Sequence, residues 1–216
     1  MSLITLKNVK KEYGKNQVLF ENLSLEIEKG EFVGLVGKSG AGKTTLLNII
    51  GLITDISEGT ITIDGHQNLS MNGKNAMILR RYTIGYLFQN YGLIEDESVL
   101  WNLKLALEYK KIKREEKLKL INKYLKQFEL SDMLNKKVYQ LSGGEQQRIA
   151  IIKLILQGSQ IILADEPTSG LDKENELIVM KLLKELNEKG ITIIMVTHNM
   201  NLCDCFSRVI NVENFR

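Results

Sequence analysis

The sequence predicts an α/β protein with a mostly parallel core sheet, an antiparallel β subdomain near the N-terminus and a helical insertion. The run FVGLV at Phe32–Val36 is almost wholly apolar, which suits a strand covered on both faces. Two later apolar runs, residues 161–164 and 191–196, are separated by a helical stretch at about 174–188. Strand, helix and strand in this order are typical of a parallel sheet with right-handed crossovers.

Shorter segments complete the predicted order of elements. Residues 2–9, 20–27 and 59–65 alternate apolar and polar side chains, as half-buried strands do, and we expect them to form the antiparallel sheet. Residues 44–52 predict a helix that follows a glycine-rich loop, and residues 84–88 predict a short strand.

No strand pattern appears between residues 91 and 140. Apolar residues at three- and four-residue spacing predict helices at residues 98–109 and at about 114–128. We therefore expect one domain over residues 1–216, with a core at about 1–90 and 155–216 and a helical subdomain at about 91–154. A length of 216 residues fits this single domain.

Composition excludes several classes of protein. The chain is 44% hydrophobic and 25% charged, and no apolar run approaches the roughly 18 residues of a membrane-spanning helix. Lysines near the N-terminus argue against a signal peptide. The net charge of +3 is too weak to indicate a nucleic-acid partner. Cys203 and Cys205, one residue apart, are expected to be reduced thiols of a cytoplasmic protein.

The charge is unevenly distributed along the chain. Residues 104–137 carry eleven basic and five acidic side chains, a balance of +6, so the remainder carries −3. A solvated helical face is the simpler interpretation. A face held near anionic lipid headgroups is the alternative.

A phosphate-binding loop is the first motif that carries chemistry. Residues 37–44, GKSGAGKT, satisfy G-x-x-x-x-G-K-[ST] between an apolar strand and a helix. Glycines allow several N–H groups to point into one concavity, and the helix N-terminus favours an anion. Lys43 supplies a charge for the β- and γ-phosphates, and the Thr44 hydroxyl can bind Mg²⁺. The predicted nucleotide-binding residues here are Gly37, Lys38, Ser39, Gly40, Ala41, Gly42, Lys43, Thr44 and Thr45.

Acidic and histidine side chains follow two of the predicted parallel strands. Asp165 and Glu166 end the strand at 161–164, and His198 follows the strand at 191–196. Ligands of open α/β sheets gather at the carboxyl ends of strands, so we expect these groups to face the phosphate loop. Asp165 is predicted to hold Mg²⁺, and Glu166 to orient or deprotonate an attacking water. His198 is predicted to act at the same edge.

A second glycine-rich helix start lies at residues 141–148, LSGGEQQR. Ser142 and Glu145 form S-x-x-E, which a capping box explains without any ligand. Gly143 and Gly144 are poor helix formers, each costing roughly 1 kcal/mol against alanine, and a cap alone does not need them. Glycines are needed where bare N–H groups approach a phosphate closely, so the sequence predicts a second contact with an anion.

Together these motifs resemble the nucleotide-binding domain of ATP-binding-cassette (ABC) transporters. The resemblance covers essentially the whole chain, and seven motifs stand in the family's order: Tyr13, the Walker A loop at 37–44, Gln89, LSGGE, the Walker B strand at 161–166, SGLD at 169–172, and His198. The chain has no N-K-x-D run of the guanine-specific kind, which favours ATP.

The resemblance implies a role for each matching position. Tyr13 stacks on adenine, and Gln89 senses Mg²⁺ and the γ-phosphate and links the core to the helical insertion. Glu166 is the catalytic carboxylate, and His198 contacts the γ-phosphate. Asp172 lies at the dimer seam. In the family the LSGGE helix start meets the γ-phosphate held by the opposite subunit, so two ATP molecules are sandwiched in a head-to-tail homodimer.

Within the family, the run IGYLFQNYGLIEDESVLWNL around Gln89 resembles exporter ATPases of the MacB and LolD kind, and most closely a group of bacteriocin exporters. The resemblance implies an ATPase subunit at the inner face of the cell membrane that powers a separate integral permease, for export of a peptide or bacteriocin or for MacB-like mechanotransmission. A cell-envelope signalling or division-associated ATPase is the alternative. A DNA- or ribosome-acting ATPase is disfavoured, because the chain has no long coiled-coil insertion and no second cassette.

An apolar cluster just after Gln89 is the predicted contact with the permease. Leu93, Ile94, Val99 and Trp101 are expected to line a groove for a permease helix. Packing inside the helical insertion is the equally weighted alternative.

Overall fold

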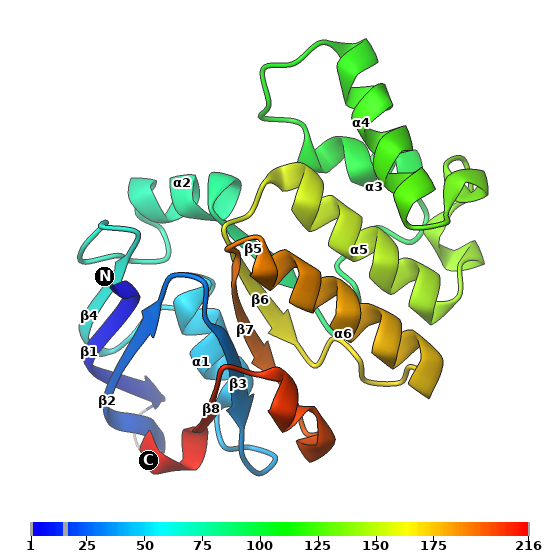
Figure 1. Ribbon diagram of the computed structural model, residues 1–216. Coiled ribbons are helices and arrows are strands. Elements are labelled where there is room, and N and C mark those ends of the chain that lie inside the picture. The colour runs from blue at the N-terminus through cyan, green and yellow to red at the C-terminus, as the bar shows by residue number, and fades with distance from the viewer. Residues whose placement is uncertain (1, 15–16, 216) are drawn as a thin grey trace.

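The computed structural model describes residues 2–14 and 17–215, and it has the predicted α/β architecture (Figure 1). A three-stranded antiparallel sheet and a five-stranded parallel sheet lie side by side, and helices surround the second of them.

The antiparallel sheet confirms the prediction for the N-terminal part. It contains β1 (Ser2–Tyr13), β2 (Gln17–Glu28) and β4 (Glu58–Ile63) in the order β2-β1-β4. β1 and β2 are longer than predicted, because irregularities in their register carry the pairing past Val9 to Tyr13. The extension brings Tyr13, the last residue of β1, close to the phosphate loop.

The core sheet is parallel, as predicted from its apolar strands. Its strands are β5 (Ile84–Leu87), β6 (Ile161–Asp165), β7 (Thr192–Val196), β3 (Phe32–Val36) and β8 (Arg208–Asn211), in the order β5-β6-β7-β3-β8. β3 and β7 are buried along their whole length. β8 was not predicted, because an exposed edge strand with the sequence RVIN lacks a continuous apolar run.

Within the part of the chain that the structure describes, six α-helices connect these strands: α1 (Lys43–Ile50), α2 (Lys74–Tyr82), α3 (Val99–Ala106), α4 (Arg114–Gln127), α5 (Gly143–Gln157) and α6 (Lys173–Glu188). Short 3₁₀ turns span Ser131–Met133, Val138–Gln140, Met200–Cys205 and Val212–Phe215. α2 was not predicted, because its sequence KNAMILRRY buries only Ala76 and Leu79. α3 ends at Ala106 rather than at 109, where the chain leaves the helix through successive turns.

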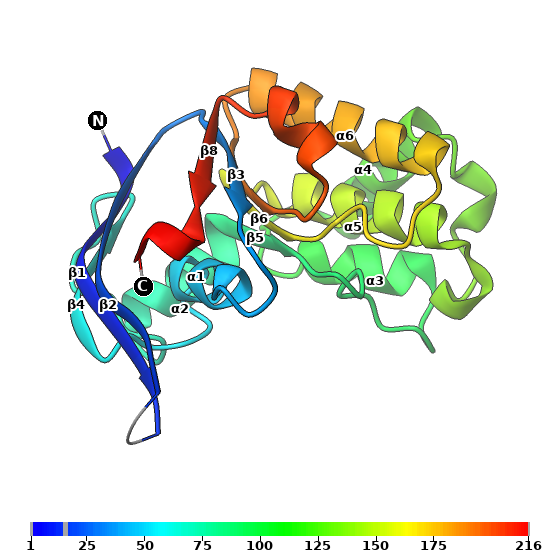
Figure 2. The ribbon, with the colours of Figure 1, turned by 90° about the horizontal axis from the view of Figure 1, so that it is seen from below.

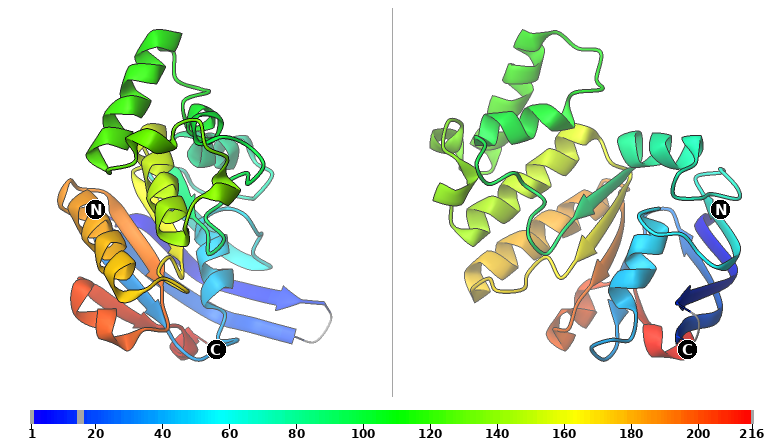
Figure 3. Two further views of the ribbon diagram at one scale, coloured as in Figure 1. Left: turned by 90° about the vertical axis from the view of Figure 1, so that its right-hand side faces the viewer. Right: turned by 180° about the vertical axis from the view of Figure 1, so that it is seen from behind.

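Two apolar layers hold the molecule together. One lies between the antiparallel sheet and the core sheet and encloses α1 (Figure 2). The other lies on the opposite face of the core sheet, under α5 and α6, and continues into α3 and α4 (Figure 3). α5 contacts β5 and α6 of the core as well as α3 and α4 of the helical insertion, so it belongs to both the core and the insertion. The predicted boundaries of the helical subdomain therefore stay a prediction.

Cys203 and Cys205 are both free thiols, as expected from their spacing. Across residues 2–14 and 17–215, no helix is both long and apolar enough to cross a membrane.

Candidate active site

The phosphate loop folds into a cradle between β3 and α1. Gly37, Gly40 and Gly42 have φ angles of 140°, 75° and 95°, which residues other than glycine rarely adopt. Lys43 is only 5% exposed, and its Nζ donates to the carbonyls of Gly37 at 2.8 Å and Lys38 at 2.9 Å. A lysine ammonium has three donors, so these two bonds fix its position and leave one N–H for a ligand.

An open cavity of about 330 Å³ lies over this loop. It brings together most of the residues predicted from three separate motifs. Its lining consists of Tyr13, Gln17, Leu19, Ser39, Gly40, Gly42, Lys43, Thr44, Thr45, Glu166 and His198. Gln17 and Leu19 were not predicted, since no motif marks them and only the pairing of β2 with β1 places them here.

Tyr13 lies at the rim of the cavity. Its ring is 45% exposed, its hydroxyl is 3.4 Å from the Thr45 hydroxyl, and the Lys11 ammonium lies 4.8 Å from the ring centroid. An exposed aromatic face next to a phosphate cradle is available for stacking on a base.

Thr44 and Asp165 meet where β6 ends beside α1. The Thr44 hydroxyl donates to Asp165 Oδ1 at 3.2 Å. Burial raises the pKa of Asp165 above its ordinary value; the hydrogen bond from Thr44 opposes this shift, and the charge of Glu166 adds to it. Burial, with a contribution from Asp165, also raises the pKa of Tyr86. A half-buried carboxylate beside a hydroxyl is a site at which a cation would relieve the cost of burying negative charge.

Glu166 and His198 form a close pair at the wall of the cavity. Glu166 Oε1 lies 2.7 Å from His198 Nε2, and the side chains are 24% and 48% exposed. The Glu166 backbone has a φ of 47° and its N–H donates to the Val196 carbonyl at 3.1 Å. A positive φ is unfavourable for a side chain of this kind, and such strain clusters at functional sites.

Gln89 is not brought to this cavity. It is exposed in the turn that follows β5, and it does not line the cavity around Lys43. The turn is attached instead to α5, because Lys153 Nζ donates to the Gly92 carbonyl at 2.7 Å. Burial lowers the pKa of Lys153. The predicted contact of Gln89 with Mg²⁺ and phosphate stays a prediction.

The second glycine-rich segment begins α5 with the predicted capping box. The Ser142 N–H donates to Glu145 Oε2 at 2.7 Å, and the Glu145 N–H donates to Ser142 Oγ at 3.4 Å. Burial acts to raise the pKa of Glu145, but its carboxylate accepts hydrogen bonds from the Ser142 N–H and hydroxyl. These bonds, with the positive charges of Arg148 and Lys136, lower the pKa overall. None of residues 142–145 lines the cavity around Lys43, so this segment cannot serve that cavity within one chain.

Both glycines of this segment also have a neighbour inside the chain. A Cβ atom on Gly143 would lie 2.8 Å from the Tyr91 hydroxyl, and one on Gly144 would lie 2.1 Å from Asn175 Oδ1. An anion is therefore not needed to explain the paired glycines. Packing against Tyr91 and Asn175 is a second reason for their small size.

Asn175 is a residue that the motifs did not single out. It lies in the first turn of α6, where its N–H donates to Asp172 Oδ1 at 2.8 Å and its Nδ2 donates to Asp172 Oδ2 at 3.0 Å. Arg148 Nη1 donates to Asn175 Oδ1 at 3.1 Å. Asn175 thus joins α5 to the loop that carries Asp172. The spacing Asp-x-x-Asn identifies only the helix cap.

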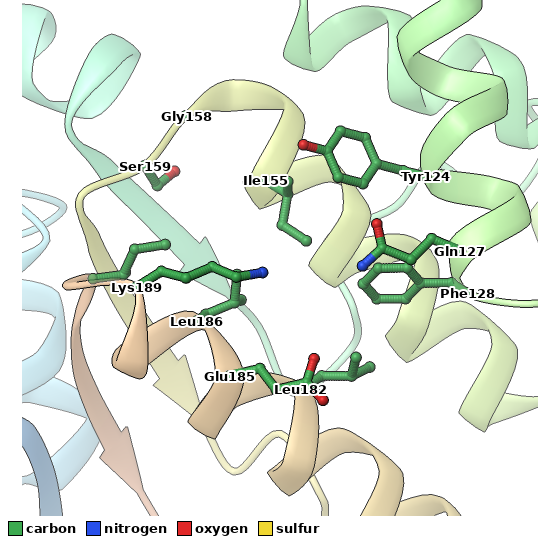
Figure 4. Close-up of a pocket in the computed structure, with 11 residues that line it drawn as sticks. Tyr124, Gln127, Phe128, Ile155, Gly158, Ser159, Leu182, Glu185, Leu186 and Lys189 are labelled. Carbon is green, nitrogen blue, oxygen red and sulfur yellow. The ribbon is translucent and has the colours of Figure 1, made fainter.

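A separate apolar cavity of about 280 Å³ lies among α4, α5 and α6 (Figure 4). Tyr124 comes from α4 and Phe128 directly follows its end, and Leu182 and Leu186 come from α6. It contains no part of the phosphate loop or of the Glu166–His198 pair, so the chemistry belongs to the cavity around Lys43.

Comparison with known families decides what kind of site this is. A family profile described as ABC transporter matches residues 20–169, more than half of the chain. The chain belongs to the ABC transporter family. This assignment confirms the predicted family and the predicted fold class.

Individual relatives of this ABC domain include two with 41% identity. One is the macrolide export ATP-binding/permease protein MacB of Campylobacter jejuni, matched over 98% of this chain and 33% of its own length. The chain thus spans about a third of that protein. The other is an uncharacterized ABC transporter ATP-binding protein, MJ1508 of Methanocaldococcus jannaschii, matched over 98% of this chain and 96% of its own length.

Solved ABC structures share the fold. A dimeric post-hydrolysis state of the cassette MJ0796 bound to ADP and Pi has a TM-score of 0.87 and 39% identity, over 96% of this chain and 93% of that one. CbiO1 of Clostridium perfringens, part of the cbiONQ transporter complex, has a TM-score of 0.86 and 27% identity, over 98% of this chain and 86% of that one.

The raised pKa of Asp165 predicts a pH-dependent cost to stability. A carboxyl group whose pKa is raised by folding binds its proton more tightly in the folded chain, so stability decreases as pH rises from its ordinary pKa of 3.8 through the folded pKa. Asp165→Asn removes this cost. We expect the nucleotide-free variant to unfold at a higher urea concentration than the wild type at neutral pH.

The advantage of Asp165→Asn should shrink as the pH falls toward 3.8. Urea unfolding across this pH range measures the effect, and Asp132→Asn, at an exposed position, controls for the loss of one negative charge. An Asp165→Asn variant that is less stable than the wild type at neutral pH would contradict the interpretation.

Proposed function

We propose that the chain is the ATPase subunit of a membrane transporter and that it hydrolyses MgATP in the cavity around Lys43. The observation that carries this proposal is the meeting of the phosphate loop with the Glu166–His198 pair in one cavity of about 330 Å³. A phosphate cradle alone binds a nucleotide, whereas a carboxylate facing that cradle is positioned to activate water.

Binding begins with the triphosphate in the cradle. The loop N–H groups and the N-terminus of α1 receive the phosphate oxygens, and Lys43 turns its remaining N–H toward the β- and γ-phosphates. Tyr13 covers the adenine from the end of β1.

Mg²⁺ fits the oxygen groups that Thr44 and Asp165 place 3.2 Å apart. A hydroxyl and a carboxylate are ligands that this ion prefers, and the raised pKa of Asp165 reflects a burial cost that a cation offsets. When bound, the ion neutralises charge on the phosphate oxygens.

Glu166 and His198 are proposed to act on the attacking water. The oxygen of the water attacks the γ-phosphorus while a Glu166 carboxylate oxygen accepts a proton from that water. The bond from the γ-phosphorus to the β–γ bridging oxygen breaks, which releases ADP. His198 holds the Glu166 carboxylate through the contact of 2.7 Å and faces the γ-phosphate. Together they orient the water on the side away from the leaving ADP.

We further infer that the active unit is a head-to-tail homodimer. Residues 142–145 do not line the cavity of their own chain, although their helix start is suited to an anion. The relative MJ0796 is dimeric, which supports pairing of two cassettes. In such a dimer Ser142, Gly143 and Gly144 would contact the ATP held at Lys43 of the partner, and Asp172 would lie near the seam.

The permease is proposed to contact the segment after Gln89. Ile94 is 47% exposed and Trp101 is 38% exposed, so both are accessible to a partner. Val99 is fully buried in the helical region, and the expectation that it lines the groove is wrong. Similarity to the macrolide export protein MacB supports an export function at the inner face of the membrane. A peptide or bacteriocin is the proposed substrate, and MacB-like mechanotransmission is the alternative.

Glu166→Gln tests the catalytic proposal. The amide cannot take a proton from water, so we expect ATP binding to persist while turnover falls by about 10²- to 10⁴-fold. Size-exclusion chromatography with ATP should then show an accumulated dimer. Lys43→Ala is the matched control, because it should lose ATP affinity and form no such dimer. Wild-type turnover by Glu166→Gln would exclude this role for Glu166.

Gly144→Ala separates two reasons for a small residue at position 144, which are contact with a phosphate and packing against Asn175. The added methyl group would lie 2.1 Å from Asn175 Oδ1, so Asn175→Ala in the same chain removes the clash. If Gly144 approaches the partner's phosphate, ATPase activity of the double variant should stay at least about tenfold below that of Asn175→Ala alone. Full recovery in the double variant would show that only packing constrains position 144.

A photo-crosslinking residue at Ile94 tests the permease contact. In membranes that contain the native complex, it should link the chain to an integral membrane protein. The same residue at Leu177, which is 67% exposed on α6, serves as the control and should not form that product. Absence of a membrane-protein adduct at position 94 would refute this contact.

A further inference from the structure

An aromatic–basic cluster lies where the C-terminal end of α2 meets the turn that follows α3. It consists of Arg81, Tyr82, Tyr109, Lys111, Lys113 and Arg114. The Arg81 guanidinium lies 3.8 Å from the centroid of the Tyr109 ring, and the Tyr82 and Tyr109 rings meet edge to face with centroids 6.3 Å apart. Figure 1 shows α2 and the link between α3 and α4 at the end of the molecule away from the phosphate loop.

Positive charge in this part of the chain is exposed, although Glu108, Glu115 and Glu116 lie close to it in the sequence. Residues 107–114, LEYKKIKR, contain four basic side chains and one acidic one. Lys111, Lys113 and Arg114 are all exposed, and none of them belongs to an ion pair within the described chain. Lys111 and Lys113 lie in the link between α3 and α4 and not on a helical face.

An apolar stripe leads along α3 to the cluster. Trp101, Leu105 and Tyr109 follow one another at four-residue spacing, which places the first two on one face of α3 and the third just beyond its end. Their exposed fractions are 38%, 40% and 54%. Tyr82, in contact with Tyr109, is 47% exposed. Tryptophan and tyrosine beside lysine and arginine are the side chains that settle at a membrane–water interface.

We propose that the aromatic–basic cluster binds the anionic headgroups of the lipid bilayer directly, beside the permease contact at Ile94 and Trp101. Charge complementarity favours an acidic surface, and the apolar stripe favours a bilayer over a nucleic acid, whose grooves and phosphates present no apolar layer to Leu105 and Trp101. The contact needs no permease, so it goes beyond the proposed function and can be measured with the chain alone.

Sedimentation of the full chain with lipid vesicles tests this proposal. Vesicles with about 30 mol% phosphatidylglycerol in phosphatidylcholine should carry down several times more protein than pure phosphatidylcholine, and raised salt should release it. The sole tryptophan, Trp101, is a built-in reporter. Its fluorescence should shift to shorter wavelength with the anionic vesicles and stay unchanged with the neutral ones.

Two triple variants with the same change in net charge locate the contact. Lys111→Gln, Lys113→Gln and Arg114→Gln together should reduce the vesicle partition coefficient by about a hundredfold, since each removed charge lowers it by about fivefold. Lys173→Gln, Lys181→Gln and Lys184→Gln, at exposed positions on α6, should reduce it far less. Both triple variants should retain the wild-type ATPase activity in the absence of lipid.

Three results would overturn the proposal. They are equal binding to neutral and anionic vesicles, equal loss of binding in the two triple variants, and preference for transfer RNA over anionic vesicles in a competition assay. None of them bears on ATP hydrolysis, so the lipid contact and the proposed ATPase fail separately.

Discussion

The parallel register of β3, β7 and β6 fixes where every charged group of the site lies. β7 pairs with both of the other strands, so the three carboxyl ends meet at one edge of the sheet. The Glu166 N–H, bound to the Val196 carbonyl, continues the pairing one residue past the end of β6. Glu166 and His198, which are 32 positions apart, come within 2.7 Å because their strands are neighbours. The phosphate loop leaves the same edge from β3.

This dependence explains which parts of the site the sequence predicts. Asp165 ends an apolar strand, and Glu166 and His198 lie within two residues of the end of one. Lys43 and Thr44 begin the helix after the loop that leaves β3. The carboxyl ends of parallel strands must meet. Their assembly therefore follows from the strands alone. Gln89 follows the edge strand β5 instead, and its exposed turn is positioned by tertiary contacts of α5 with Gly92. No local pattern predicts such a contact.

The same distinction holds for the fold. Continuous apolar runs identified β3, β6 and β7, because burial on both faces demands them. β8 and α2 escaped prediction because each buries too little apolar surface to leave a pattern. Asn175 was missed for a related reason. Its hydrogen bond to Asp172, the N-cap of α6, is local, whereas its contacts with Arg148 and Gly144 join segments about thirty residues apart.

The left-handed backbone of Glu166 has a consequence for any redesign of this chain. Glycine or asparagine would occupy a φ of 47° at lower cost, and the strain of keeping glutamate there is on the order of 1 kcal/mol. A procedure that selects substitutions by thermal stability alone would therefore favour replacement of this carboxylate early. Under the proposed catalytic role of Glu166, stability and turnover make opposite demands on position 166, so a thermostable version of the domain should gain its stability elsewhere and leave Glu166 in place.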